Sequence, residues 1–133
     1  MMLQRFPILL KENECKLLIK YDGEREKNKY TVKLLYNDLK RGSLGKDTDN
    51  PFAELKDVFK NDVSFSDNGI SDEFFNTVNK LLENVRTKLG DASIISVIME
   101  GNKENIMYTL HIQTETYTKH CTTKNIQELF EIY

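Results

Sequence analysis

The chain has 133 residues, of which 39% are hydrophobic and 30% are charged, with six glycines and two prolines. This length and composition are typical of one ordinary domain and lie outside the disordered range, so we expect residues 1–133 to form a single globular domain. The net charge of −2, from 19 basic and 21 acidic residues, excludes the basic excess that is typical of direct nucleic-acid binding.

The N-terminal residues and the two cysteines indicate the cellular compartment in which the protein is expected. The first ten residues hold a short apolar run broken by Pro7, which is too short for a signal peptide or a membrane span. Cys15 and Cys121 lie near opposite ends of the chain, and such cysteines in an unsecreted protein are more often free thiols than a disulfide. We therefore expect a cytoplasmic protein without membrane contact. A disulfide would require both ends of the chain to pair in one sheet.

The first elements are strands. Residues 15–21 and 30–36 alternate apolar and polar side chains with period two, and an Asp-Gly turn follows the first run. This pattern predicts a β-hairpin with one solvent-facing side. Residues 6–10 are a candidate third strand, which Pro7 would restrict to an edge of the sheet.

Two helices are expected in the middle of the chain. Residues 38–50 are polar, without periodicity, and are predicted to be a loop. Asn50 and Pro51 are a preferred helix start, and residues 61–70 form a second polar stretch. From Ser71 a longer apolar stripe with helical spacing runs to Leu89 and ends at Gly90.

The last third returns to strands. Residues 93–99 are almost wholly apolar and are predicted to be a central strand covered on both faces. A strand then begins near residue 105, with Tyr108 on its inward side and His111 on the other. Residues 114–122 either extend it or bend into another strand, and a short helix begins near residue 123.

This order of elements predicts an α+β fold. The expected architecture is a two-layer sandwich, with a mainly antiparallel sheet of about four to six strands in two hairpin regions. Two or three helices are expected to pack on one face of that sheet.

Two segments resemble ligand-binding loops but have the wrong spacing. Residues 42–46 place only two residues between the glycines, whereas a phosphate-binding loop has four, and Asp47 replaces its Ser or Thr. In residues 64–75, a calcium loop would need carboxylates where Ser64 and Phe75 stand. We expect no cofactor and no metal ion, and leave open only a weak cation site on this second loop or on Asp47 and Asp49.

Histidine and cysteine show no catalytic arrangement. His120 and Cys121 are adjacent and point to opposite faces of a strand. His111 precedes His120 by an odd number of residues, so a continuous strand would also separate these two side chains, although a bend would change this. We therefore predict no catalytic residues and no enzyme activity.

These features favour a small protein that binds another protein and acts by occupying its surface, as immunity proteins, antitoxins and phage-encoded inhibitors do. Recognition is expected on the polar loops. The candidate contacts are four acids facing a basic partner and one aromatic anchor, namely Asp47, Asp49, Asp67, Asp72 and Tyr36.

Two other classes stay open. The first is a small enzyme or ligand-binding domain, with a pocket between the sheet and the helix at residues 71–89 and with His111 or Tyr108 at its mouth. The second is a structural or assembly subunit, in which the edge strand at residues 6–10 pairs with another copy.

Overall fold

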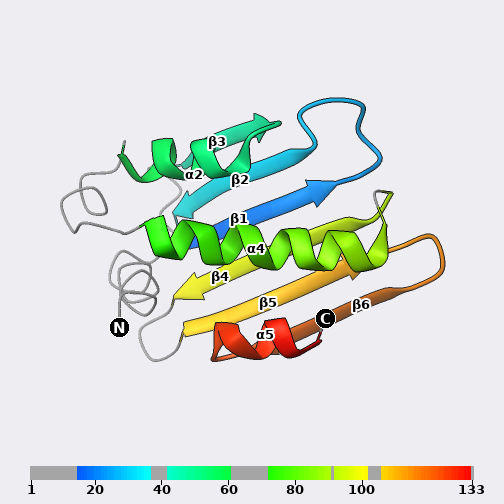
Figure 1. Ribbon diagram of the computed structural model, residues 1–133. Coiled ribbons are helices and arrows are strands. Elements are labelled where there is room, and N and C mark those ends of the chain that lie inside the picture. The colour runs from blue at the N-terminus through cyan, green and yellow to red at the C-terminus, as the bar shows by residue number, and fades with distance from the viewer. Residues whose placement is uncertain (1–14, 37–41, 61–71, 91, 102–105, 133) are drawn as a thin grey trace.

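The computed structural model describes residues 15–36, 42–60, 72–90, 92–101 and 106–132 (Figure 1). Six strands and three helices lie in this part of the chain. In chain order they are β1 (Cys15–Asp22), β2 (Tyr30–Tyr36), β3 (Ser43–Thr48), α2 (Pro51–Lys60), α4 (Asp72–Leu89), β4 (Ile94–Gly101), β5 (Ile106–Gln113), β6 (Thr118–Thr123) and α5 (Ile126–Ile132).

The strands form one antiparallel sheet in the order β3-β2-β1-β4-β5-β6. Two three-stranded meanders, β1 to β3 and β4 to β6, therefore meet at the central β1–β4 pair, in which Leu17 is opposite Met99. The helices α2 and α4 lie in the connection between the two meanders (Figure 1).

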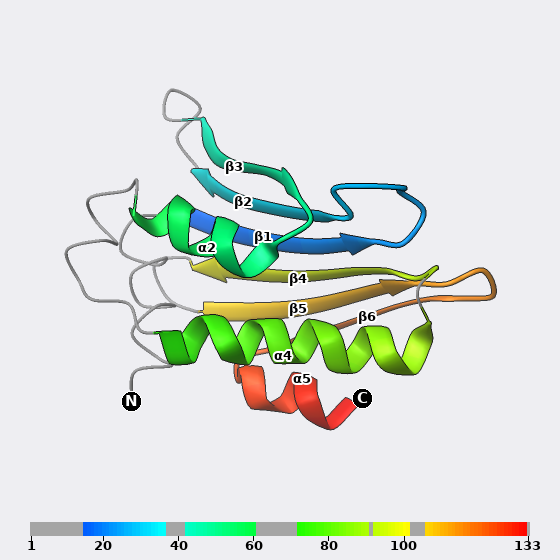
Figure 2. The ribbon, with the colours of Figure 1, turned by 45° about the horizontal axis from the view of Figure 1, so that its top comes forward.

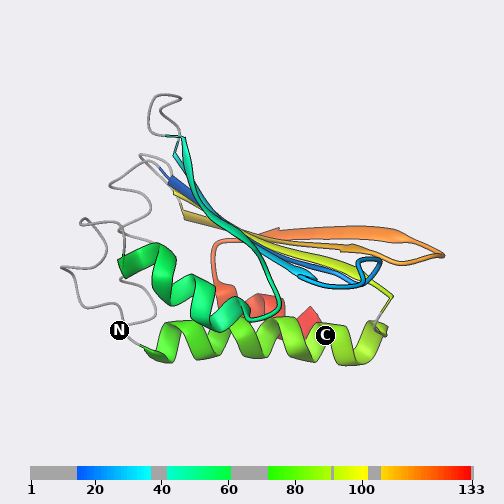
Figure 3. The ribbon, with the colours of Figure 1, turned by 90° about the horizontal axis from the view of Figure 1, so that it is seen from above.

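All three helices cover the same face of the sheet (Figures 2 and 3). The protein is thus a two-layer α+β sandwich with a mainly antiparallel sheet, which confirms the predicted fold class. No helix of the described residues lies over the other side of the sheet, as the edge-on view of Figure 3 makes plain. We call this side the open face.

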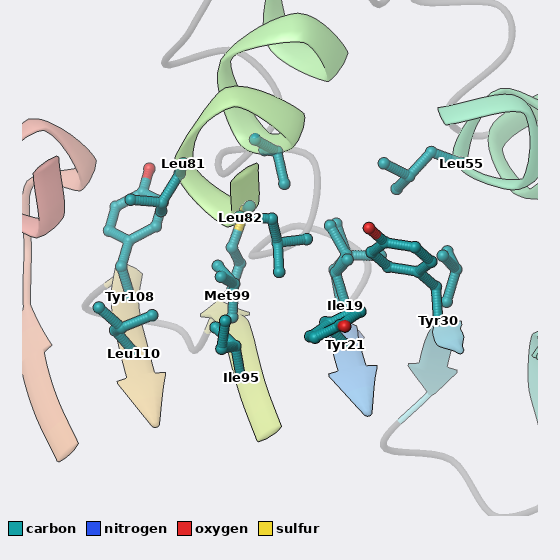
Figure 4. Packing of buried hydrophobic residues seen from close by; sticks show 14 of the residues in the cluster. Ile19, Tyr21, Tyr30, Leu55, Leu81, Leu82, Ile95, Met99, Tyr108 and Leu110 are labelled. Carbon is teal, nitrogen blue, oxygen red and sulfur yellow. The ribbon is translucent and has the colours of Figure 1, made fainter. Parts of the chain in front are cut away.

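The core lies between the helices and the covered face. On β1 buried and half-buried residues alternate, so that Leu17 and Ile19 point to the helices, as a period-two pattern dictates. Leu81 and Leu82 of α4 pack over the middle of the sheet, while Leu55 of α2 lies beside β2 (Figure 4). Each such aliphatic side chain contributes about 1.5 to 3 kcal/mol through burial.

Local signals place the helix ends where the sequence predicts them. The Asn50 side chain accepts a hydrogen bond from the Ala53 amide (3.1 Å), which caps α2. Gly90, at a φ of 93°, follows the last residue of α4 and donates its amide to the Arg86 carbonyl (2.9 Å). Glycine adopts this left-handed conformation without steric cost, which explains its position at the helix end.

The prediction of a loop over residues 38–50 is wrong for its second half, because Ser43–Thr48 forms the edge strand β3. Gly45 has a φ of 117°, and a Cβ atom there would overlap the Val32 carbonyl oxygen. The strand thus approaches β2 only because this residue has no side chain. The candidate strand at residues 6–10 lies outside the described residues.

The C-terminal strands settle one open alternative and correct one expectation. The Thr114 amide donates to the Tyr117 carbonyl (2.9 Å), so the chain turns and β6 runs back along β5. β4 is central, between β1 and β5, but the described helices cover only one of its faces, and Ile94 and Ile98 are half-buried on the other. Its apolar run therefore does not indicate burial on both sides.

Candidate functional site

One residue from each of the six strands forms a row across the open face. The strand register places these residues opposite one another in five successive pairs. We call this set the polar row, and from β3 to β6 its members are Asp47, Thr31, Lys20, Ser96, His111 and His120. Polar and ionisable side chains thus cross the whole sheet on the side that the described helices leave uncovered.

The β3 end of the polar row is an ordered acid–arginine network. Thr31 donates its hydroxyl to Asp47 Oδ1 (2.7 Å), and Arg25 Nη1 donates to the Thr31 hydroxyl (2.9 Å). Arg25 also lies 3.4 Å from Asp47 Oδ1 and 3.3 Å from Asp22 Oδ2. The hydrogen bond from Thr31, followed by the charge of Arg25, lowers the pKa of Asp47. The network therefore holds an ionised carboxylate and a guanidinium in defined positions.

The β6 end of the row is a pair of exposed histidines. His111 and His120 are opposite each other in the β5–β6 register, with ring centroids 6.4 Å apart and planes at 70°. The turn between the strands brings onto one face two residues that a continuous strand would separate. The chain therefore follows the bent alternative that the sequence left open.

A second row, next to the first, supplies the apolar centre of the open face. Leu18 on β1 and Ile98 on β4 are opposite each other and half-buried. Lys33 flanks them on β2. On the other side, Thr109 and Thr122 hydrogen-bond through their hydroxyls (3.2 Å). The centre of the face thus combines aliphatic area with one cationic and two hydroxyl side chains.

The five residues predicted as partner contacts do not lie together. Asp47 lies on the open face, whereas Tyr36 packs against the core beneath the helices. Asp49 accepts a hydrogen bond from the Lys29 amide (3.3 Å) beside the β1–β2 hairpin. Asp72 is the first residue of α4, and Asp67 lies outside the described residues.

The two residues predicted at a pocket mouth lie on opposite faces of β5. Tyr108 points to the helices and is 5% exposed, and burial raises its pKa to about 12. His111 belongs to the open face. In the described part of the chain, two cavities of about 260 and 370 Å³ lie at one end of the sheet, where both are lined by Ala92, Thr114 and Glu115. Neither is lined by His111 or Tyr108.

Sequence reasoning missed a polar cluster between α4 and the first hairpin. Arg86 donates to the Tyr30 hydroxyl (2.7 Å), which donates to Glu83 Oε1 (3.0 Å). The Arg86 guanidinium also lies over the Tyr21 ring, 5.2 Å from its centroid. Burial, followed by the hydrogen bond to Glu83, raises the pKa of Tyr30 to about 12. The four side chains fix α4 to β1 and β2. Tyr30 is 53 and 56 residues from its two partners in α4, so the sequence gives no signal of these contacts.

The two thiols lie on the covered face of the sheet, opposite to the polar row. Cys15 is fully buried, Cys121 is half-buried, and neither forms a disulfide. Within the described ranges, no three His, Cys, Asp or Glu residues are close enough to hold a metal ion. The described helices also include none with the length and apolar character needed to cross a membrane.

Comparison with protein-family models, with curated proteins and with solved structures gave no match to this chain. The function is therefore inferred from the geometry of the open face and of the rows that cross it.

Proposed function

We propose that this chain is a small protein-binding module that docks through the open face and acts by occupying its partner's surface. The observation that supports this is the distribution of side chains on that face. Leu18 and Ile98 form an aliphatic centre, and charged side chains surround it, among them Lys20, Lys33 and Arg25. An apolar centre with a polar rim is the usual arrangement of a protein–protein interface.

The open face is large enough for this role. Six strands at spacings of about 4.8 Å, with six to eight residues in each strand at about 3.3 Å per residue, give a face of roughly 24 by 20 to 26 Å, or about 500 to 600 Å². One partner in an interface of standard size contributes about 800 Å². The open face can therefore supply most of one such interface without a contribution from the helices.

Charge indicates the chemistry of the partner. Among the described residues Lys33 makes no ion pair, because its charge acts on Asp47 only at longer range, and it lies directly beside Leu18. Asp47, by contrast, is already bonded to Thr31 and Arg25. We therefore propose a partner surface that offers aliphatic side chains at its centre and a carboxylate opposite Lys33. Asp47 orients Arg25 toward that partner and does not itself need a cation from it.

Docking through the open face replaces the recognition by acidic loops that the sequence predicts, but the class of protein stays the same. Immunity proteins, antitoxins and phage-encoded inhibitors act by blocking a surface, and a rigid sheet face suits that action because little conformational entropy is lost on binding. The pocket alternative has no such support, since His111 and Tyr108 lie on opposite faces of β5. The assembly alternative rests on residues 6–10, outside the described residues.

The proposal is tested by capturing partners with matched variants. Wild-type protein, Leu18→Glu and Ile98→Glu are used as bait in lysate of the source cells, with Lys80→Glu on the exposed side of α4 as the control. We expect a stoichiometric partner with wild type and with Lys80→Glu, and its loss with both open-face variants. Circular dichroism and the unfolding midpoint check that each variant is folded.

Two results would contradict the proposal. A partner retained by both glutamate variants would show that docking does not use the open face. A partner lost only with Lys80→Glu would move the docking surface to α4.

A further inference from the structure

His111 and His120 have the geometry of a two-ligand metal site. The hydrogen bond between the Thr114 amide and the Tyr117 carbonyl defines one hydrogen-bonded pair of the hairpin. Because such pairs alternate along antiparallel strands, the His111–His120 pair, three pairs further on, is of the non-hydrogen-bonded kind. The side chains in such a pair approach most closely, with Cβ atoms about 4.5 to 5.5 Å apart.

The two rings are close to the separation that one shared ion needs. With metal–nitrogen bonds of about 2.0 to 2.1 Å, two imidazole centroids on one tetrahedral ion are roughly 5 Å apart. The observed separation is 6.4 Å. Both side chains are exposed, so small rotations about their χ angles close the remaining roughly 1 Å at little cost.

The ring nitrogens are available as ligands. Among the described residues, neither histidine makes a hydrogen bond or an ion pair. The neighbours on the same face of β5 and β6 are neutral, namely Thr109, Gln113, Thr118 and Thr122. A cation at this position would therefore meet two imidazoles and hydroxyl or amide groups, without a carboxylate.

We propose that His111 and His120 together bind one divalent transition-metal ion, such as Zn²⁺ or Ni²⁺, on the open face of the sheet. The described residues supply only two ligands, because no three His, Cys, Asp or Glu residues lie close enough together there to hold an ion. Water fills the other coordination positions. Imidazole suits Zn²⁺, Ni²⁺ and Cu²⁺, whereas Mg²⁺ and Ca²⁺ require oxygen ligands. Binding of the ion does not depend on the docking of a partner, because the ion alone is the ligand.

Metal binding also has a structural consequence at the edge of the sheet. Among the described strands, β6 lies at an edge of the sheet and pairs only with β5. An ion held by one histidine of each strand links them side chain to side chain and stabilises the folded state in proportion to its occupancy. The unfolding midpoint should therefore rise with added ion, which provides a second readout.

The experiment titrates Zn²⁺ and Ni²⁺ separately into untagged protein by calorimetry. A Cys121→Ser background removes the half-buried thiol next to His120, since thiolates also bind these ions. The variants are His111→Ala and His120→Ala, and the control is Lys119→Ala, which lies beside His120 on the other face. Mg²⁺ is the control ion.

We expect one ion per chain, with affinity lowered about tenfold or more in each histidine variant, because the second ligand acts at high effective concentration. Lys119→Ala should bind as the background does, and Mg²⁺ should not bind. The unfolding midpoint should rise with Zn²⁺ only when both histidines are present. Equal affinity in either histidine variant, or a loss with only one of them, would overturn the proposal.

Discussion

On β1, Leu17 and Ile19 are fully buried beneath the helices, whereas Leu18 and Lys20, their immediate neighbours, are half-buried on the open face. The two sides of the sheet are therefore built from alternate residues of the same strands. The covered side is apolar almost throughout, and the open side mixes aliphatic, charged and hydroxyl groups. This difference separates the residues that form the core from those that face away from the described helices.

The largest difference in stability is expected between substitutions of two neighbouring residues on β1. Ile19→Ala leaves a cavity under the helices and should lower the free energy of unfolding by about 2 to 5 kcal/mol. Leu18→Ala, on the open face, should lower it by less than about 1 kcal/mol. Urea unfolding of both variants measures the difference, and equal losses would mean that the two faces contribute alike to stability.

The second-largest loss of stability is expected at the edge strand β3, in which apolar and polar residues do not alternate. Gly45→Ala adds both an unfavourable positive φ and an overlap with the Val32 carbonyl oxygen, and should cost about 2 to 3 kcal/mol. Gly42, at a φ of 71°, has open space around the position of a Cβ. Gly42→Ala should therefore cost only about 1 to 2 kcal/mol. The same urea experiment compares them, and a smaller cost at Gly45 would contradict the tight β2–β3 contact.

A smaller effect concerns the polar contacts on the covered side. Tyr30→Phe removes hydrogen bonds to Arg86 and Glu83 and should cost about 1 kcal/mol at pH 7. Tyr108 has no hydrogen-bond partner among the described residues. Tyr108→Phe should therefore lower the free energy of unfolding by less than Tyr30→Phe does.

Alkaline pH tests the same two tyrosines. Their pKa values are raised from 10 to about 12 in the folded protein. Above pH 10 the unfolded state therefore holds fewer protons than the folded state, so stability falls between pH 10 and pH 12. Each Tyr→Phe variant should show a shallower fall in urea unfolding across this range. A slope unchanged in both variants would rule out these groups as the cause.

The smallest change in stability is expected at acid pH for a substitution on the open face. The pKa of Asp47 is lowered in the folded protein, so its contribution to stability is present above the ordinary aspartate pKa and is lost as pH falls through the folded value. Asp47→Asn should remove this contribution, which is below about 1 kcal/mol for an exposed group. Thr31→Val should reduce it too. Urea unfolding between about pH 5 and pH 2, the range in which aspartate carboxyl groups titrate, checks both variants.

The fold class was predictable because its main elements have strong local patterns. Alternation of apolar and polar residues predicted β1 and β2, and an apolar stripe with helical spacing that ends before Gly90 predicted α4. β3 was missed because Gly45, Lys46 and Asp47 have no apolar alternation, and its position depends on pairing with β2. An edge strand of this kind is determined by its neighbour more than by its own sequence.

The candidate site was less predictable than the fold. Alternation shows that a strand has two faces, but it does not show which strands are neighbours, so the polar row could not be assembled from the sequence. A continuous strand would separate His111 and His120, and the sequence left a bend open as the alternative; the turn at Thr114–Tyr117 is that bend. The predicted contacts Asp47 and Tyr36 were each plausible alone but lie on opposite faces of the sheet.

The central β1–β4 pair has a consequence for folding kinetics. Each meander is made of hairpins whose partners are close in the chain, but the pair between them brings Lys16 to Glu100, across a connection that contains α2 and α4. Closing so long a loop loses entropy before its contacts form, and this slows folding. The hairpins can therefore form early, and the rate at which the complete sheet appears is set by how fast its two halves find each other.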